Sequence, residues 1–586
     1  MSQDGTADRA TAPAAPATPA LPPDATLADL VPAAAAQDAG ATALVHGSTR
    51  LTWGELEEEV SRVAHGLVAA GVVAGHRVAL AMANRPEMVV AYLAVLRVQA
   101  VAVPLNPRAT AEEVARMLAD SGARMVLADE VAVDVVRTGV ARLETELSGA
   151  TDRPGGTLPA ALLQRAVVPR VVVAGTTLRP GERSYDHLRA ERGREHPPLV
   201  DPERLATLLY TSGASGRPRA VMLSHRALLA NVEQVAGVEP TMIGPGDVVL
   251  GALPLFHVYG LNAVLGGVLR HRATLVLVDA YDPEVVLDLV AAERVSVLPI
   301  APTVIGHVLG RERLAERLAT VRLVLSGSAP LDPDQVVAFH EATGIPVHQG
   351  YGLTEAAPVV TSTLGVPAAP ADGQEVVHHG GSEAGPEEGA EESRVPAGQP
   401  DPRSVGTALP GIEIRLVDDH GQTPLQGDPG QVSIRGANLF SGYWPDGDDA
   451  PDEDGWWATG DVGFLAPDGQ LFLVDRVKEL VIVSGFSVYP TEIEDVVAEV
   501  PGVREVAVIG VPDDDTGEAV VAYVVAPDQD PATVGAAVRA RCVVRLARFK
   551  QPRRVEVVDA LPHTVTGKVR KGSLRAAERR RDLELL

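Results

Sequence analysis

Apolar residues recur at helical spacing near the start of the chain and form short continuous runs further along. In the segment 55–67, the positions that share one helical face are Leu56, Val60, Val63 and Leu67. The run 77–82 (RVALAM) has the length and composition of a strand, and an apolar helix is expected over 87–97. Order is therefore predicted to begin near residue 26.

A regular alternation starts near residue 205. Short apolar runs bounded by turn residues and separated by helical patterns occur at 205–210, 248–253, 273–278, 295–300 and 321–326. Near-continuous apolar runs of this length are typical of strands that are buried on both faces. The pattern predicts a large α/β domain with buried sheets and helices.

A second, smaller unit is predicted after about residue 476. In the segment 490–500, Ile493, Val496, Val497 and Val500 share one helical face. Strand-like segments, a helix around 532–547 and a strand at 553–558 complete a small α+β pattern. We therefore expect an N-terminal domain over 26–474, a hinge at 475–478 and a mobile C-terminal domain over 479–586.

Two stretches are poor in the large apolar residues that folding requires. Residues 1–25 are rich in Ala, Pro and Thr, and residues 366–403 interrupt the α/β pattern. Within the second stretch, residues 372–394 hold seven acidic residues and one basic residue, with many glycines. The interpretation is a disordered tail and a disordered acidic insert, with a functional insert as the alternative.

Composition narrows the classes of partner. The formal net charge of −26 argues against a nucleic-acid partner or an anionic membrane, since both require clustered positive charge. The single cysteine, Cys542, excludes an intrachain disulfide and fits a reducing compartment. No signal peptide and no apolar run long enough to span a bilayer are apparent, so a cytoplasmic enzyme without an integral membrane segment is expected.

The segment 210–220 (YTSGASGRPRA) follows a predicted strand directly. Its backbone N–H groups and hydroxyls suit phosphate oxygens, and Arg219 supplies positive charge. The chain contains no G-x-x-x-x-G-K-[ST] sequence, so this is not a Walker A loop. Taken alone, the segment is also compatible with a plain turn.

Eight short motifs together change that balance. In chain order they are YTSGASGRPRA (210–220), PLFHVYG (254–260), SGSAPL (326–331), QGYGLTE (349–355), TGD (459–461), DRVKEL (475–480), GFSVYPTEIE (485–494) and PHTVTGK (562–568). In their sequence and order the chain resembles the adenylate-forming superfamily, which contains acyl-CoA synthetases, peptide-synthetase adenylation domains and luciferases. The resemblance extends from about residue 30 to about 577.

The resemblance implies nucleotide contacts in the central motifs. Tyr351 is expected to stack on adenine, Thr354 to contact the α-phosphate and Glu355 to bind Mg²⁺ on the phosphates. Asp461 and Arg476 are expected at the ribose hydroxyls. The other residues expected to bind nucleotide are Thr211, Ser212, Gly213, Ser215, Gly216, Arg219, Gly327, Ser328 and Gly352.

The resemblance also implies the residues of the reaction. Lys568 is the expected catalytic cation, because attack of a carboxylate on the α-phosphorus brings like charges together. His257 is expected beside the acyl carboxylate, and Gly485 in the loop that meets the pantetheine of CoA. His residues suggest no metal site.

Two pairs of residues depart from the usual phosphate loop of that family. Ala214 and Ser215 stand where two threonines are usual, and Arg219 and Ala220 stand where Lys-Gly is usual. Arginine keeps the charge but not the compact ammonium group. Altered ATP affinity is expected before loss of function.

The motifs PLFHVYG and GFSVYP are most similar to those of CoA ligases for fatty or aryl acids. The expected activity is an AMP-forming acyl-CoA synthetase that uses ATP, Mg²⁺ and CoA. Two alternatives stay open: a fatty-acid AMP ligase that delivers the acyl group to a carrier protein, and a non-catalytic nucleotide or acyl binder with a degenerate phosphate loop.

Overall fold

The structure is a computed structural model of the chain. It describes residues 25–149, 158–190, 201–211, 219–328, 331, 333–366, 400–418, 421–425, 430–476, 481–488, 490–527, 529–562, 569 and 571–582. The predicted tail, apart from Ala25, lies outside the described residues. Residues 367–399 of the predicted insert also lie outside them.

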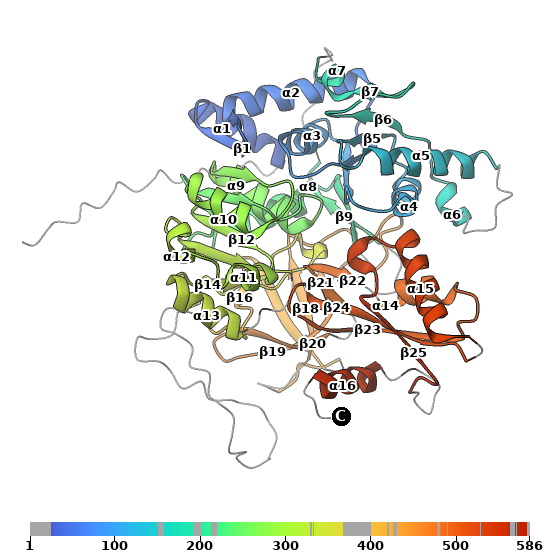
Figure 1. The fold of residues 1–586 in the computed structure, drawn as a ribbon. Coiled ribbons are helices and arrows are strands. Elements are labelled where there is room, and N and C mark those ends of the chain that lie inside the picture. Colours follow the sequence, from blue (N-terminus) through green and yellow to red (C-terminus); the bar gives the residue numbers. More distant parts are fainter. Residues whose placement is uncertain are drawn as a thin grey trace, which may run out of the picture.

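Two seven-stranded sheets form the larger part of the molecule (Figure 1). The first has the order β14–β13–β12–β10–β11–β1–β2 and is parallel except at β2. Its strands are β1 (Thr42–His46), β2 (Thr49–Thr52), β10 (Val248–Gly251), β11 (Thr274–Leu277), β12 (Val297–Ile300), β13 (Leu323–Ser326) and β14 (Val347–Gln349).

The second sheet has the order β7–β6–β5–β3–β4–β8–β9 and is parallel except for the β8–β9 pair. Its strands are β3 (Arg77–Ala81), β4 (Val101–Pro104), β5 (Met125–Ala128), β6 (Arg170–Val173), β7 (Arg183–Ser184), β8 (Leu205–Thr211) and β9 (Arg219–Ser224). All five apolar runs that sequence assigned to buried strands are confirmed, as β8, β10, β11, β12 and β13.

Helices cover both sheets, and the longest bury the stripe that periodicity predicts. The helical segments before residue 366 are η1 (Leu27–Asp29), α1 (Leu30–Asp38), α2 (Trp53–Ala69), α3 (Pro86–Arg97), α4 (Ala111–Ser121), α5 (Val133–Leu147), α6 (Ala160–Leu163), α7 (Tyr185–Ala190), α8 (His225–Ala236), η2 (Tyr259–Val264), α9 (Leu265–His271), α10 (Pro283–Ala292), α11 (Thr303–Val308), α12 (Leu314–Arg317), α13 (Pro333–Thr343) and η3 (Thr354–Ala356). In α2, Leu56, Val60, Val63 and Leu67 are fully buried, as predicted.

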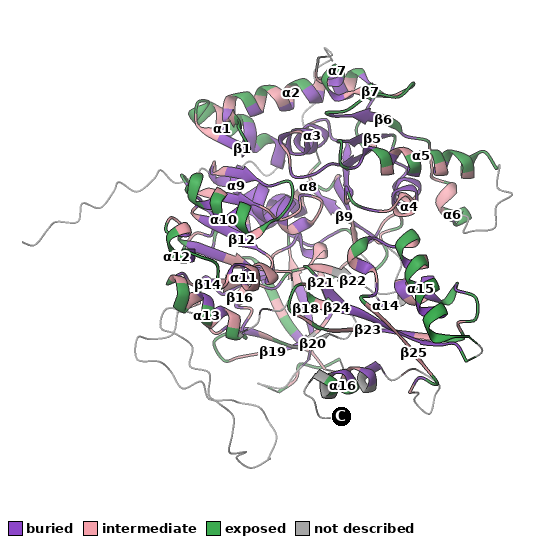
Figure 2. Ribbon diagram, viewed as in Figure 1, coloured by how far each residue is buried: buried purple, intermediate pink, exposed green. Residues whose placement is uncertain are grey.

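The apolar core is continuous across the sheets and the helices between them. Trp53 on α2 and Tyr92 on α3 are among its largest fully buried side chains. Figure 2 shows this directly, since the strands of both sheets are mainly buried while the outer faces of the peripheral helices are exposed. Burial on both faces explains why these strands are nearly uninterrupted apolar runs.

Two smaller sheets follow. A two-stranded sheet joins β15 (Thr361–Ser362) to β16 (Thr407–Ala408), and an antiparallel sheet has the order β17–β18–β19–β20. Its strands are β17 (Ile412–Val417), β18 (Gly430–Gly436), β19 (Trp456–Leu465) and β20 (Leu471–Arg476). Residues 25–476 are called the body below.

The C-terminal unit, residues 481–582, is built on a five-stranded sheet. Its elements are β21 (Val481–Val483), β22 (Phe486–Val488), α14 (Pro490–Ala498), β23 (Glu505–Asp513), β24 (Gly517–Val525), α15 (Pro531–Arg545), η4 (Arg548–Lys550), β25 (Arg554–Val558) and α16 (Lys571–Asp582). One apolar cluster packs α14 and α15, including Cys542, on the sheet, and a second cluster includes Leu574 of α16. The predicted α+β pattern is confirmed, and Figure 1 shows this unit beneath α4.

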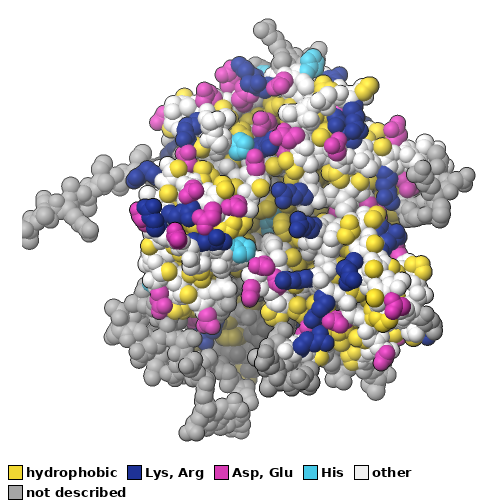
Figure 3. Space-filling view, viewed as in Figure 1, with side chains coloured by type: hydrophobic (Ala, Val, Ile, Leu, Met, Phe, Trp, Pro, Cys, Tyr) yellow, Lys and Arg dark blue, Asp and Glu magenta, His cyan; other side chains and the backbone are white. Residues whose placement is uncertain are grey.

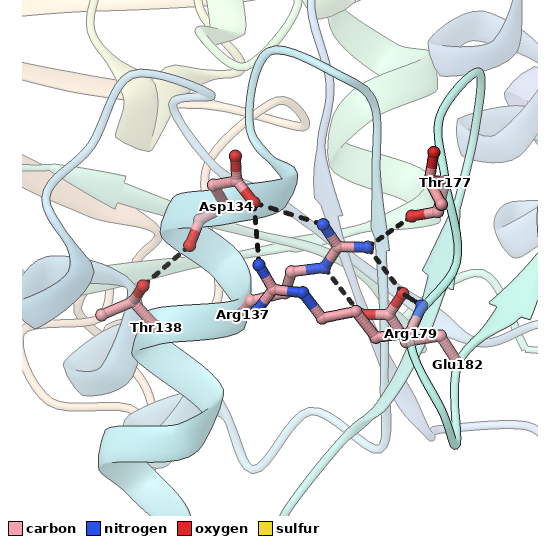
Figure 4. A network of polar contacts seen from close by, with 6 residues as sticks. All are labelled: Asp134, Arg137, Thr138, Thr177, Arg179 and Glu182. Atoms are coloured by element: carbon pink, nitrogen blue, oxygen red, sulfur yellow. Dashed lines mark hydrogen bonds and ion pairs between the residues drawn. The ribbon is translucent and has the colours of Figure 1, made fainter.

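A network of polar contacts fixes α5 to the turn before β7 (Figure 4). Arg137 donates to both carboxylate oxygens of Glu182, at 2.7 and 2.8 Å, and to the carbonyl of Thr177 at 2.7 Å. Arg179 and Arg137 both approach Asp134 Oδ1. These contacts lie within the body and hold α5 against the segment that leads into β7, the end strand of the second sheet.

On the face shown in Figure 3, acidic and basic side chains are interspersed, and basic side chains gather along its centre despite the net charge of −26. Among the described residues, none of the helices combines the length and the apolar character that crossing a bilayer requires.

Gly406 is a position where the backbone leaves no room for a side chain. Its φ is +85°, and a Cβ would lie 2.0 Å from the carbonyl carbon and oxygen of Ser362. We expect Gly406→Ala to lower the free energy of unfolding by about 2–4 kcal/mol, because strain at positive φ adds to a backbone clash. Chemical denaturation measures this.

Gly421→Ala is the matched control. Gly421 has a similar φ of +76°, but nothing lies within 4 Å of the added Cβ. Its effect should be about 1 kcal/mol, from backbone strain alone. Equal effects at the two positions would contradict the steric argument.

Candidate active site

A cavity of about 690 Å³ lies between the body and the C-terminal unit. Its wall includes residues that follow strands of the first sheet, residues of β19, and Gly485 of the C-terminal unit. The candidates from sequence that line it are Thr211, His257, Gly327, Ser328, Tyr351, Gly352, Thr354, Glu355, Asp461 and Gly485. The fold thus gathers residues that are 274 positions apart in the chain.

Sheet topology explains much of this gathering. His257 follows β10, Gly327 follows β13 and Tyr351 follows β14, and these strands run parallel in one sheet. Parallel strands end on the same edge, so the segments that leave them converge there. The cavity occupies this edge.

The segment after β14 packs tightly against the neighbouring backbone. A Cβ at Gly350 would lie 2.3 Å from the Thr361 carbonyl oxygen, and one at Gly352 would lie 2.4 Å from that of Pro358. The backbone N–H of Tyr351 donates to Thr361 Oγ1 at 3.0 Å. Only glycine fits on either side of Tyr351, and the close approach fixes where its ring enters the cavity.

Tyr351 and Asp461 meet at the end of the cavity that sequence assigns to adenosine. The Tyr351 hydroxyl donates to Asp461 Oδ2 at 2.6 Å. Asp461 lies on β19 directly opposite Arg476 on β20, so the two residues expected at the ribose are paired in register. The side chain of Arg476 lies outside the described part of the structure.

Glu355 is held by a second phenol. Tyr443 Oη donates to Glu355 Oε1 at 2.5 Å, and the Glu355 carbonyl accepts the Phe440 N–H at 2.9 Å. The N–H of Trp444 donates to the Ala220 carbonyl at 2.8 Å, which fixes the segment that carries Tyr443 against β9. The phenol therefore orients the carboxylate, and the Phe440 N–H fixes the backbone that carries it.

Arg219 lies over this phenol. Its guanidinium carbon is 3.5 Å from the centroid of the Tyr443 ring, and its Nη1 donates to Asp449 Oδ2 at 2.8 Å. A guanidinium stacked on an aromatic face in this way is a cation–π contact, which a lysine makes with poorer overlap. Arg219, which stands where lysine is usual, therefore packs on the tyrosine that holds the Glu355 carboxylate.

The predicted phosphate loop closes a hairpin. Thr211 at the end of β8 pairs with Arg219 at the start of β9, so both ends of the loop are fixed beside Tyr443. Ser212, Gly213, Ser215 and Gly216 lie outside the described residues, as does Lys568.

His257 occupies the turn between β10 and η2. The Asn84 side chain holds that turn by donating to the carbonyls of Gly251 and Leu253, at 3.0 and 2.8 Å, and by accepting the Leu255 N–H. Desolvation lowers the pKa of His257 to about 4, so the ring is neutral at neutral pH. A neutral imidazole can orient a carboxylate by hydrogen bonding but adds no positive charge.

One part of the cavity wall is apolar. Val235, Met242, Ile243, Ala263 and Val264 are buried and line it. The Tyr259 ring lies nearby, packed so closely that a Cβ at Gly327 would be 3.0 Å from it, and its hydroxyl donates to the Leu325 carbonyl at 3.2 Å. This wall suits the hydrocarbon part of an organic acid.

The C-terminal unit brings a turn to the cavity. Gly485, with φ +80°, lies between β21 and β22, and a Cβ on it would be 3.7 Å from Cβ of Ser328. The next residue, Phe486, stacks on Phe256 with ring centroids 6.0 Å apart and lies edge-on to His257 at 6.4 Å. The unit thus contacts the wall that holds His257.

Sequence reasoning missed Tyr443, Phe486 and Trp457, which lines the cavity. Tyr443 had a signal, because an aromatic residue between glycine and Trp-Pro in SGYWP is unusual for a surface turn. Phe486 lies inside a motif already singled out, beside Gly485. No feature of the sequence around Trp457 indicated that it would line the cavity.

Glu355 fits a role in holding Mg²⁺ on the phosphates of ATP. Glu355 lines the cavity and its carboxylate is held by Tyr443. One or two carboxylates are the usual protein donors to Mg²⁺ when phosphates and water supply its other ligands. Among the described residues, no group of three or more His, Cys, Asp or Glu side chains is arranged to hold a metal ion.

Comparisons with known proteins agree with this site. Residues 31–444 match the AMP-binding enzyme family, and residues 492–568 match the AMP-binding enzyme C-terminal domain. The chain is 32% identical to a 4-coumarate–CoA ligase-like protein of Oryza sativa subsp. japonica, over 90% of this chain and 88% of that protein. It is also 32% identical to a long-chain-fatty-acid–CoA ligase of Escherichia coli O157:H7, over 94% of both.

Among solved structures, the amide bond synthetase McbA from Marinactinospora thermotolerans matches with a TM-score of 0.73 and 28% identity. The match covers 94% of this chain and 99% of that protein. The chain therefore belongs to the AMP-binding enzyme family, which confirms the resemblance to adenylate-forming ligases. It is an ATP-dependent, AMP-forming acid–thiol ligase, similar over nearly its whole length to acyl- and aryl-CoA ligases.

We expect Tyr443→Phe to lower kcat/KM for MgATP in adenylate formation by about tenfold or more, because a hydrogen bond to a charged group is lost. The ring beneath Arg219 is kept. Acid-dependent pyrophosphate release at varied MgATP measures the change.

Tyr523→Phe is the matched control, since Tyr523 also donates to a carboxylate, that of Glu578, within the C-terminal unit. It should leave this kcat/KM within about twofold. An unchanged value in Tyr443→Phe would mean that Glu355 is oriented without the phenol.

The lowered pKa predicts the protonation behaviour of His257. Because the folded state favours the neutral ring, its stabilising contribution is complete above about pH 6.5 and is lost as the pH falls toward 4. The ε1 resonance of His257, assigned by its absence in His257→Gln, should not titrate between pH 5.5 and 8. A midpoint near 6.5 would contradict the burial argument.

Proposed function

We propose that this enzyme activates a fatty or aryl carboxylic acid as its acyl-adenylate and then transfers the acyl group to CoA. The observation that carries the proposal is the cavity itself. It joins a Tyr351–Asp461 pair, an oriented Glu355 and an apolar wall beside His257, and the turn with Gly485 lies at its side. This arrangement supports the proposal, in which adenosine, phosphates, acyl chain and thiol occupy one continuous space.

In the first step, a carboxylate oxygen of the acid attacks the α-phosphorus of ATP, and the bond from that phosphorus to the bridging oxygen breaks. Acyl-AMP forms and pyrophosphate leaves. Asp461 accepts from the ribose hydroxyls, Thr354 donates to the α-phosphate, and neutral His257 orients the carboxylate without neutralising the attacking oxygen. Mg²⁺ held at Glu355, when bound, lowers the charge repulsion between ATP and the acid.

In the second step, the sulfur of CoA attacks the acyl carbonyl carbon, and the carbonyl–oxygen bond to AMP breaks. Gly485 has no side chain, so the turn at 484–486 leaves space for a narrow pantetheine chain beside Ser328. Lys568 is assigned to the first step only. Serving both steps requires the C-terminal unit to turn about a hinge, for which residues 475–478 are proposed.

The class of acid follows from the apolar wall and from the relatives. The wall formed by Val235, Met242, Ile243 and Val264 offers burial to a hydrocarbon chain or ring. One relative is named a 4-coumarate–CoA ligase-like protein and another a long-chain-fatty-acid–CoA ligase. A fatty or aryl acid is therefore the proposed substrate.

A panel of acids and acceptors tests the proposal. Acid-dependent pyrophosphate release followed by CoA thioester formation is the expected result. Acyl-AMP without thioester would favour transfer to a carrier protein, and an amide formed with an added amine would favour the reaction named for McbA. No pyrophosphate release with any acid would support a binding protein and overturn the proposal.

Lys568 separates the two steps. Its charge is needed only while the carboxylate meets the α-phosphate, so Lys568→Ala should lower adenylate formation by about 10²–10³-fold. Thioester formation from supplied acyl-AMP should change far less. Lys568→Arg, which keeps the charge, should recover part of the first step, and equal losses in both steps would refute the assignment.

A further inference from the structure

Among the described residues, two ionic contacts that start from the first turn of α4 cross the boundary between the body and the C-terminal unit. Lys550 Nζ lies 3.1 Å from Glu113 Oε1 and 2.8 Å from Glu492 Oε1. The three side chains are only 9%, 13% and 12% exposed. Glu113 belongs to the body, whereas Lys550 and Glu492 belong to the C-terminal unit.

The second contact is beside the first. Arg545 Nε lies 2.8 Å from Glu112 Oε2 across the same boundary. Within its own unit Arg545 also pairs with Glu499 at 2.6 Å, and Glu112 pairs within the body with Arg142 at 3.4 Å. Two adjacent acidic residues of one helix thus face two basic residues of the other unit.

Each of these four charged residues also has a partner on its own side. Lys550 keeps Glu492, Arg545 keeps Glu499 and Glu112 keeps Arg142 when the units separate. Glu113 keeps a structural role as well, because its Oε2 accepts the backbone N–H of Thr110 at 2.8 Å in the capping box of α4. Breaking a buried ion pair is costly mainly because it leaves a charge without a partner. Here each charged group keeps a local contact, so separation of the two units avoids that cost.

The contacts lie next to the residues that place Gly485. Phe549 precedes Lys550 and stacks on Phe486 with ring centroids 4.5 Å apart. Phe486 in turn stacks on Phe256 of the body and follows Gly485 in the chain. A continuous set of contacts thus leads from the first turn of α4 to the turn in the cavity.

We propose that Glu112 and Glu113 are positioning residues for thioester formation, which they favour by holding the C-terminal unit in the orientation that places Gly485 in the cavity. The proposal rests on the proposed function, in which the two steps use different orientations of this unit. A contact shifts a population only if it differs between the two states. These two ion pairs differ between the two orientations because they cross the boundary between the units. They can break and form again because their members keep local partners.

The test compares three forms of the full chain: wild type, the double variant Glu112→Gln/Glu113→Gln, and Glu55→Gln. Glutamine serves at the third position of a capping box, so α4 keeps its cap while its first turn loses the charges. Glu55 occupies the equivalent position of the capping box of α2, where its Oε2 accepts the Thr52 N–H at 2.8 Å. It is the matched control for loss of a capping carboxylate.

The two half-reactions are measured separately. In the double variant, thioester formation from supplied acyl-AMP and CoA should fall about three- to tenfold, because the loss of each ion pair is moderated by the local partner that its cation keeps. Acid-dependent pyrophosphate release should stay unchanged or rise. Glu55→Gln should behave as wild type in both. An unchanged thioester step, or equal loss in both steps, overturns the proposal.

A distance measurement gives a readout that needs no activity. Spin labels are attached to cysteines introduced by Val131→Cys in the body and Val544→Cys in the C-terminal unit. The native Val131 and Val544 are 42% and 66% exposed, so both positions are accessible to the label. Cys542 is buried and its pKa is raised to about 11 by desolvation, so it remains unlabelled.

The distance distribution should be narrow in wild type and in Glu55→Gln, and broader or bimodal in the double variant. Identical distributions in all three forms overturn the proposal. If wild type makes no acyl-AMP from any acid, the proposed function fails, and the distance distributions still decide whether the two ion pairs hold the unit.

Discussion

Parallel strands must end on the same edge of their sheet, and the placement of the whole site depends on this constraint. β10, β13 and β14 deliver His257, Gly327 and Tyr351 to one edge because they share direction in the first sheet. The β8–β9 hairpin of the second sheet adds Thr211, and β19 adds Asp461. No single segment contains the site, so its chemistry exists only when the sheets are packed together.

Two carboxylates of the cavity wall each accept a phenolic hydroxyl, Asp461 from Tyr351 and Glu355 from Tyr443. A phenol orients a carboxylate without neutralising it, which an arginine partner in the same place would do. The negative charge of Glu355 therefore stays available to a cation. Arg219 contributes through the Tyr443 ring, on whose face its guanidinium lies.

Sequence alone predicted the strands well because they are buried on both faces, so burial left a continuous apolar run at 205–210 or 321–326. The resemblance to adenylate-forming enzymes also named several of the residues that line the cavity. Sequence alone could not predict that Arg219 stacks on Tyr443, since 224 residues separate them. Nor could it predict how the C-terminal unit packs on the body. Glu113 and Glu492, the partners of Lys550, resemble exposed glutamates in the sequence, and only three-dimensional packing brings them to Lys550.

The chain has four tryptophans, and their positions have a practical consequence. Trp53 is sealed in the core, whereas Trp444, Trp456 and Trp457 lie within 14 residues of sequence beside the active site. Trp457 lines the cavity, and the Trp444 indole N–H donates to the Asp120 carbonyl at 2.9 Å. Trp457 is thus an intrinsic fluorophore in the cavity wall, and its ultraviolet emission is a built-in optical probe of ligand occupancy in the unmodified protein.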